Sequence, residues 1–212
     1  MLSFILGAKV FNYYAPGYLK LGGFLRSKDG VTPIYGEGFF HVSLSGVIWY
    51  TIVFDYRDPG GEYWELLRIG GVRVEDECER LRFKMQRLMD EERIVVNGVD
   101  VKARVLDAFI EVRGVRRRST ATFIVMIPFT PRLGVNVYEN FYGGAVAEYD
   151  YTVYWVLECG EIVSVESPGL IDIRGSTAVI RVKKGVRIPG YESVSFNIPV
   201  DCFRRIQCLQ SS

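Results

Sequence analysis

The residues best suited to chemistry in this chain of 212 residues are acidic ones that recur in small groups. Glu148 and Asp150 lie two residues apart, and we take them with Glu139 as the candidate catalytic carboxylates. Two carboxyl groups about 5–10 Å apart would serve glycoside hydrolysis. The alternative interpretation is that these groups lie on the solvated face of a strand.

A second candidate site lies between Asn136 and Gly144, where amides and aromatic residues precede a pair of glycines. Aromatic rings beside amide groups suit the recognition of a sugar or a nucleobase, by stacking and by directed hydrogen bonds. The same residues would also suit an ordered surface loop. The ligand-binding residues that we predict are Asn136, Tyr138, Asn140 and Tyr142.

Neither a metal nor a cofactor is expected. The chain has one histidine, His41, and its four cysteines include no Cys-x-x-Cys pair. Motifs for phosphate loops, dinucleotides and calcium loops are also missing from the sequence. His41 shares a strand face with Ser43 and Ser45, but side chains two apart on a strand lie about 7 Å apart, which is too far for a nucleophile and its base.

A nucleic-acid partner is not expected either. Arg113, Arg116, Arg117 and Arg118 form a basic cluster, yet the whole chain has a formal net charge of +1. Binding to a nucleic acid depends on neutralising many phosphates. A solvated hairpin tip is the simpler interpretation of this cluster.

The pairing of Cys78, Cys159, Cys202 and Cys208 stays open, because four cysteines allow three full pairings. Cys202 and Cys208 are close enough in the chain to bridge if the tail folds back. Free thiols in buried positions are an equally good interpretation.

Composition indicates a thermophile and a cytoplasmic protein. Arginine outnumbers lysine by 19 to 7, and the chain has only five asparagines and three glutamines, a scarcity of heat-labile amides that thermophile proteins show. Met1–Gly7 is too short for a secretion signal and lacks basic residues. The uncharged stretch Gly38–Phe54 is at the lower limit for a membrane helix, and its β-branched and aromatic residues favour two adjacent strands, so no membrane span is expected.

Short runs rich in Val, Ile, Tyr and Phe, separated by turn residues, predict a mainly antiparallel β protein. Asn97-Gly98 suits a type I′ hairpin turn that sets Val96 against Val99 and Ile94 against Val101. Gly175-Ser176 suits a type II′ turn. A reversal of the polar phase after Lys102 predicts a β-bulge near Leu106-Asp107.

Two further elements follow from hydrophobic spacing. Ala121–Ile127 has little polar alternation, which predicts a central strand buried on both faces. Apolar residues recur at intervals of three and four over 74–91, which predicts one amphipathic helix there. The residues of this apolar stripe are Val74, Cys78, Leu81, Met85 and Leu88.

The fold class predicted is mainly β (α+β by strict count), an antiparallel β-sandwich or partly open barrel with one amphipathic helix near residues 74–91. We expect one domain over 1–212; the alternative is an N-terminal β subdomain (1–72), a helix (73–92) and a C-terminal β-sandwich (93–212).

Three functions fit this sequence. The first is a binding or interaction protein for a small molecule, a sugar or a protein, possibly a homo-oligomer, because aromatic residues make up 14% of the chain without an assembled catalytic set. The second is the carboxylate-dependent hydrolase. The third is a structural subunit of a larger assembly.

Overall fold

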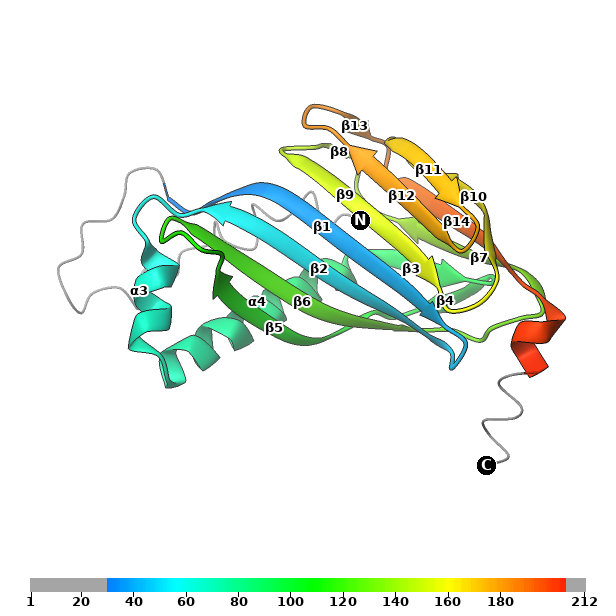
Figure 1. Cartoon of the computed structure of the whole chain (residues 1–212), viewed down its shortest axis with the longest axis horizontal. Helices are drawn as coiled ribbons and strands as arrows, with labels where there is room; N and C mark the ends of the chain where they lie inside the picture. The colour runs from blue at the N-terminus through cyan, green and yellow to red at the C-terminus, as the bar shows by residue number, and fades with distance from the viewer. Residues whose placement is uncertain (1–29, 205–212) are drawn as a thin grey trace.

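The computed structural model describes residues 30–204, and its two main layers are a seven-stranded sheet and a five-stranded sheet (Figure 1). In spatial order, sheet A consists of β11 (Leu170–Arg174), β12 (Thr177–Val182), β9 (Asp150–Leu157), β1 (Thr32–Ser43), β2 (Val47–Arg57), β6 (Arg118–Pro128) and β5 (Arg104–Val112). Sheet B consists of β10 (Glu161–Glu166), β14 (Tyr191–Ile198), β7 (Gly134–Phe141), β3 (Arg93–Val96) and β4 (Val99–Val101). A two-stranded pair joins β8 (Ala145–Val146) to β13 (Arg187–Ile188).

The predicted β-rich, sandwich-like fold is confirmed, with one correction to the strand directions. β1 pairs with β9 in parallel, so sheet A is mixed rather than antiparallel throughout. Strands from before and after the helices lie in this one sheet. The division of the chain into domains stays a prediction.

The predicted amphipathic helix is α4 (Val72–Asp90), which begins two residues earlier than expected. Its apolar stripe buries Leu81, Met85 and Leu88, together with Met89, and the helix packs along β5. The expectation of a single helix was wrong, because a shorter helix, α3 (Glu62–Ile69), precedes it. A last helical segment begins at Val200.

Helix α3 begins after Pro59-Gly60-Gly61, which resembles a plain turn in the sequence. The buried carboxylate of Asp58 accepts hydrogen bonds from the backbone N–H groups of Glu62 and Tyr63, both at 2.9 Å. These bonds satisfy two of the donors that a helix leaves open at its start. The Tyr63 hydroxyl then donates to Glu77 at 2.7 Å and joins α3 to α4.

Both predicted hairpins are confirmed residue by residue. Val96 pairs with Val99 and Ile94 with Val101, and Asn97 and Gly98 both have positive φ, as a type I′ turn requires. At the second hairpin, Arg174 pairs with Thr177 across Gly175-Ser176. The predicted bulge also occurs, because Leu106 is the extra residue between two register positions of β5.

The core fills the space between sheet B, α4 and the inner face of sheet A. Strand β6 lies inside sheet A, next to the edge strand β5. The predicted burial on both faces was wrong for one of them: Ala121, Phe123, Val125 and Ile127 are buried, whereas Thr122, Ile124 and Met126 are half-buried. Gly38–Phe54 forms most of β1 and β2, and within residues 30–204 no helix is long and apolar enough to span a membrane.

Cys159, in the turn after β9, forms a disulfide with Cys202 in the last helical segment, with the two Cα atoms 5.9 Å apart. The pairing of Cys202 with Cys208 that chain proximity suggested is therefore wrong, and Cys208 itself lies outside the described residues, as does Met1–Gly7. Closeness in the sequence did not predict the bond, because folding brings the turn after β9 to the end of β14 at one end of the two sheets. Cys78 is a free thiol.

Replacing Cys159 with serine should lower the free energy of unfolding by about 4 kcal/mol, because a cross-link between residues 43 apart removes much of the entropy of the unfolded chain. Urea unfolding without reductant measures this loss, and Cys78→Ser is the control that should change it little. Peptide mapping that finds Cys202 linked to Cys208 would contradict the assignment.

Candidate functional site

Four polar side chains form a row across the inner side of sheet B, where apolar residues are the rule. We call this set the polar row: Ser167, Glu192, Asn140 and Glu92. Glu192 on β14 pairs directly with Asn140 on β7, and Asn140 pairs on its other side with Ile94, two residues after Glu92. Since side chains two apart on a strand share a face, the register brings these groups to one place.

Hydrogen bonds join the members of the polar row in pairs. Ser167 donates to a carboxylate oxygen of Glu192 at 2.7 Å, and the amide of Asn140 donates to Glu92 at 2.6 Å. Both carboxyl groups are buried, with 7% of Glu192 and 4% of Glu92 exposed. Buried carboxylates need such partners, because their charged forms are poorly solvated there.

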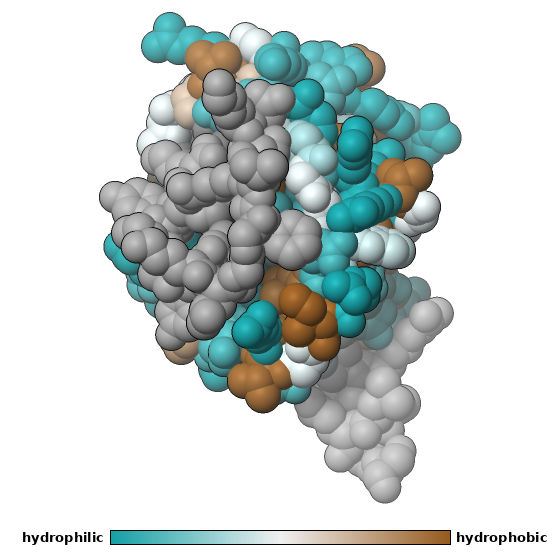
Figure 2. All heavy atoms as spheres, turned by 90° about the vertical axis from the view of Figure 1, so that its left-hand side faces the viewer, coloured by the Kyte–Doolittle hydropathy of each residue, from teal (hydrophilic) through white to brown (hydrophobic). Residues whose placement is uncertain are grey.

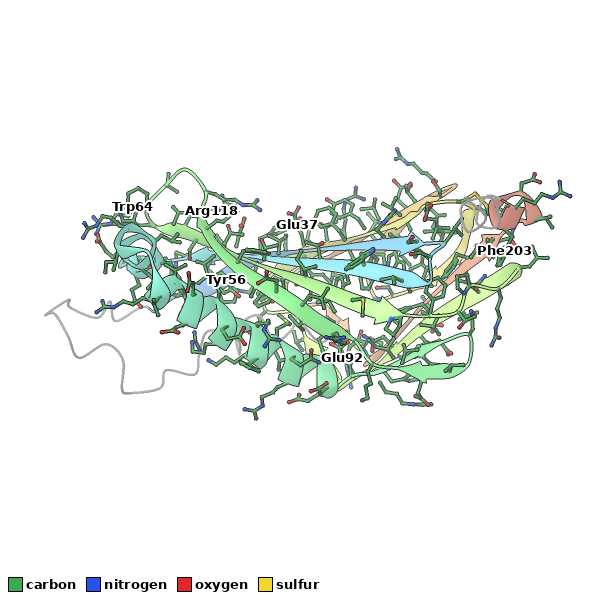
Figure 3. The ribbon with its side chains drawn as sticks, turned by 90° about the horizontal axis from the view of Figure 1, so that it is seen from below. Glu37, Tyr56, Trp64, Glu92, Arg118 and Phe203 are labelled. Atoms are coloured by element: carbon green, nitrogen blue, oxygen red, sulfur yellow. A yellow bond between two sulfur atoms is a disulfide. The ribbon has the colours of Figure 1, made fainter. Side chains whose placement is uncertain are left out.

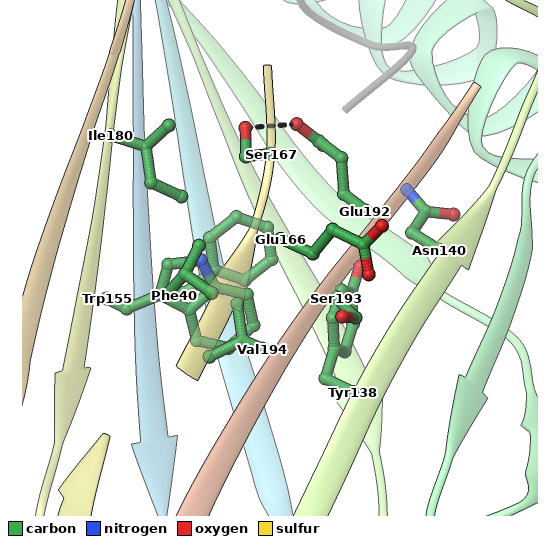
Figure 4. Close-up of a pocket in the computed structure, with 11 residues that line it drawn as sticks. Phe40, Tyr138, Asn140, Trp155, Glu166, Ser167, Ile180, Glu192, Ser193 and Val194 are labelled. Carbon is green, nitrogen blue, oxygen red and sulfur yellow. Dashed lines mark hydrogen bonds between the residues drawn. The ribbon is translucent and has the colours of Figure 1, made fainter. Parts of the chain in front are cut away.

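A pocket lies beside the polar row and is lined by residues of β1, β7, β9, β10, β12 and β14 (Figure 4). Its apolar wall contains Trp155 stacked on Phe40, with ring centroids 4.2 Å apart, and the edge of Tyr138 contacts Trp155. Its volume is about 290 Å³ including the part open to solvent, near the lower end for small-molecule sites. The enclosed part has room for little more than a water molecule.

Electrostatics single out Glu192 within this site. Burial raises the pKa of its carboxyl to about 7, with a smaller contribution from the charge of Glu92, while the hydrogen bond from Ser167 acts in the opposite direction. Burial also raises the pKa of Tyr142 and Tyr151, and the nearby Glu192 adds to both shifts. Glu192 therefore changes its charge near neutral pH, whereas these two tyrosines stay protonated.

Two buried polar atoms beside Glu192 have no hydrogen-bond partner among residues 30–204. They are the amide oxygen of Asn140, which accepts, and the hydroxyl of Tyr142, which donates. Tyr142 lies close enough to Glu192 to influence its pKa, but its geometry falls short of a full hydrogen bond. Buried polar groups are rarely left without a partner, so each such group calls for an explanation.

The four predicted ligand-binding residues all lie on the inner side of sheet B, in phase along β7 and its end. The structure brings three of them to the site: Tyr138 and Asn140 line the pocket, and Tyr142 is adjacent to Glu192. Asn136 is separate. Its side chain bonds to the backbone of Arg132 and Gly134 and to Asn97, so it holds the turn before β7.

The three predicted catalytic carboxylates do not meet. Glu139 points away from the pocket on the opposite face of β7 and accepts from the Tyr191 hydroxyl at 3.2 Å. Asp150, at the start of β9, pairs with Lys183 at 2.7 Å, and that contact lowers the pKa of its carboxyl. Glu148 is exposed before β9.

The serines near His41 and the arginine cluster both have the structural roles that the simpler interpretation of each predicts. Ser43 donates to Glu158 at 2.8 Å instead of engaging His41. In the basic cluster, Arg116 pairs with Glu65 and Arg118 with Asp55, which reduces the charge open to phosphates. Figure 2 views this end of the molecule, where the visible described surface is mostly hydrophilic with separate apolar patches.

Glu92, Glu192 and Ser167 were missed by the sequence analysis, although two of them leave a signal. Glu192 stands in phase with Val194, Phe196 and Ile198 along β14, and Glu92 stands in phase with Ile94 and Val96. The signal is an acidic residue at a position whose neighbours on the same strand face are apolar. Ser167 follows β10 and carries no comparable signal.

Comparisons with known proteins add little. No family model matches the chain, and no curated protein does. Among solved structures, the chain is similar to yeast leukotriene A4 hydrolase in complex with bestatin and to native leukotriene A4 hydrolase from Saccharomyces cerevisiae, at 8% identity and a TM-score of 0.31 in both cases. The matches cover 79% and 92% of this chain and 29% and 33% of those chains, so the chain spans about a third of their length. A likeness this weak supports no inference about function.

Stability should fall as the pH rises through the range of Glu192. The folded state holds a proton on Glu192 up to a pKa of about 7, whereas the unfolded chain releases it near 4.5. The folded protein therefore loses up to about 3 kcal/mol from this group between pH 4.5 and pH 7. Glu192→Gln should remove this slope, as urea unfolding at a series of pH values measures. Equal slopes in the two proteins would contradict the assignment.

Proposed function

We propose that this protein binds a small molecule that presents a protonated amine to the polar row and an apolar part to the Phe40–Trp155 wall. The observation that carries the proposal is a buried, ionisable carboxyl group, Glu192, beside the amide oxygen of Asn140, an acceptor that has no hydrogen-bond partner among residues 30–204. Sites of this kind combine an apolar lining with a few directed polar groups.

The charge of the site favours a cation over an anion. Both ionisable groups of the polar row are acidic, and no Lys or Arg of the described residues forms an ion pair with Glu192. A carboxylate or phosphate ligand would be repelled once Glu192 ionises, whereas an ammonium group would stabilise that ionised form. The amide oxygen of Asn140 accepts a second ammonium proton.

The opposite end of the pocket sets the shape of the ligand. Phe40, Trp155, Ile180 and Val194 provide aromatic and aliphatic surface beside the polar row. A short, flat ligand with one amino group satisfies both ends. The site therefore favours the interpretation of this chain as a binding protein. Among small molecules, it favours short, flat ones with one amino group.

A carboxylate-dependent hydrolase is the second candidate, favoured by the pKa of about 7 on Glu192, which suits a general acid near neutral pH. Glu92 and Glu192 would replace the three carboxylates expected from the sequence. The two functions differ in what happens to a bound ligand, since a binding protein releases it unchanged.

2-Phenylethylamine and phenylacetate form a matched pair of probes for this site. By saturation-transfer NMR at pH 8, the amine should bind and the acid should not, and binding of the amine should weaken at pH 5.5, where Glu192 is protonated. Glu192→Gln should weaken amine binding at least tenfold, a loss of about 1.4 kcal/mol.

Glu139→Gln is the matched control, because it removes the same charge from the opposite face of β7 and should leave binding unchanged. Equal binding of the two probes, or equal effects of the two substitutions, would refute the proposal.

A further inference from the structure

Residues 1–29, which precede the described part of the chain, are rich in apolar side chains. Sixteen of them are apolar, and six of these are aromatic. The basic residues of this segment are Lys9, Lys20, Arg26 and Lys28, and its one acidic residue is Asp29. Segments that remain unfolded are poor in aromatic and other apolar residues, so this composition calls for a surface on which the segment is buried.

Two inward positions of β1 carry no side chain. Figure 3 shows Glu37 pointing away from the side of sheet A on which Glu92 lies, so the residues next to it, Gly36 and Gly38, face inward. The side chains that flank these glycines in the register are large and buried: Ile52 and Phe54 on β2, and Tyr151 and Val153 on β9. A glycine inside a strand marks a place where a ligand or another backbone approaches closely.

The polar row lies near these glycines. Burial raises the pKa of Tyr151, the pairing partner of Gly36, and the charge of Glu192 raises it further, so these two side chains are close together. Phe40, the next inward residue of β1 after Gly38, lines the pocket. The inward positions of β1 therefore lead from the start of the strand to the candidate site.

The two buried polar atoms without a partner among residues 30–204 need different kinds of partner. The amide oxygen of Asn140 needs a donor, whereas the hydroxyl of Tyr142 needs an acceptor. An ammonium group offers donors only, so it leaves Tyr142 unsatisfied. A peptide main chain offers both an N–H and a C=O in every residue other than proline, and so satisfies both atoms.

The segment is long enough to reach the site. The described chain begins at Gly30, and β1 begins two residues later at Thr32. Phe40 is ten residues beyond Gly30, which is about 33 Å along an extended strand. A segment of 29 residues spans up to about 100 Å when extended, so it can turn back along β1 and pass the polar row.

The segment and the site have opposite charges. Residues 1–29 have a formal net charge of +3, which leaves −2 on the rest of a chain whose net charge is +1. Both ionisable groups of the polar row, Glu92 and Glu192, are carboxyl groups. Charge complementarity of this kind favours the segment over an acidic partner.

We propose that residues 1–29 of this chain pack on the inner face of β1 and occupy the site at the polar row, so that a ligand has to displace them. The competition with a ligand rests on the proposed function, whereas the docking of the segment does not. Because a competent site is then only a small fraction of the population, the apparent affinity for an amine is reduced by that fraction.

Photo-crosslinking of the full chain tests where the segment lies. With p-benzoylphenylalanine in place of Tyr142, irradiation should join position 142 to a peptide from residues 1–29 of the same chain, as mass spectrometry of the digested monomer detects. The matched control is the same substitution at Val135, which is 60% exposed on the opposite face of β7 and should give no such product.

Three crosslinking results would overturn the proposal. The first is a product from position 142 that involves only residues 30–204. The second is an equal yield of products with residues 1–29 from both positions. The third is a crosslinked dimer, which would assign the segment to a neighbouring copy.

Cutting the segment from the folded protein tests the competition. A protease recognition sequence is inserted after Lys28, the folded chain is cut, and the released segment is removed by size-exclusion chromatography. The dissociation constant of 2-phenylethylamine at pH 8 should fall at least tenfold after the cut, with the uncut insertion variant as control. Circular dichroism checks that the cut protein stays folded, and the crosslinking test does not depend on the cut.

The two tests separate this proposal from the proposed function. An amine that binds equally before and after the cut would overturn the competition and leave the amine site in place. An amine that binds neither form, while position 142 crosslinks to residues 1–29, would support the docking of the segment and refute the proposed function.

Discussion

Burying the carboxyl group of Glu192 between two sheets costs free energy unless the group is protonated or well hydrogen-bonded. The arrangement around the pocket follows from that cost. Ser167 from the edge of sheet B reaches it with one hydrogen bond, and Asn140 stands opposite it in the register. The pKa of this carboxyl group is still raised to about 7, because its hydrogen bonds offset only part of the free-energy cost of burying the charge. A purely structural core would carry an apolar side chain here without this cost, and that contrast is the basis for proposing that Glu192 binds a ligand.

The two faces of sheet A have different surroundings. Its inner face supplies Phe40, Trp155 and Ile180 to the pocket and most of the aromatic core. Its outer face is mixed, because Phe39 and Trp49 are about 40% exposed there beside Glu37 and His41.

Local patterns in the sequence predict the hairpins, the bulge and α4, because period and turn chemistry act over a few residues. Helix α3 was missed because its cap, Asp58, lies before two glycines and a proline that resemble a turn. The parallel pairing of β1 with β9 and the Cys159–Cys202 bond depend on contacts between distant segments, which no local pattern encodes.

Only part of the candidate site was predictable, again because the sequence shows local patterns and not contacts between distant segments. Tyr138, Asn140 and Tyr142 were found because they cluster along one strand. Their partners are Glu192, on β14, and Glu92, immediately before β3, and only the register of the strands brings them together. The predicted carboxylates Glu139 and Asp150 were plausible by spacing, but each points away from the pocket or into an ion pair.

The most direct test of this account is a pH titration of the Glu192 carboxyl carbon by ¹³C NMR, with the resonance assigned by its loss in Glu192→Gln. A single titration with a midpoint near 7 is expected in the ligand-free protein. A midpoint near 4.5 would show that the carboxyl group is solvated like any surface glutamate, and it would contradict the buried binding site on which the proposed function rests.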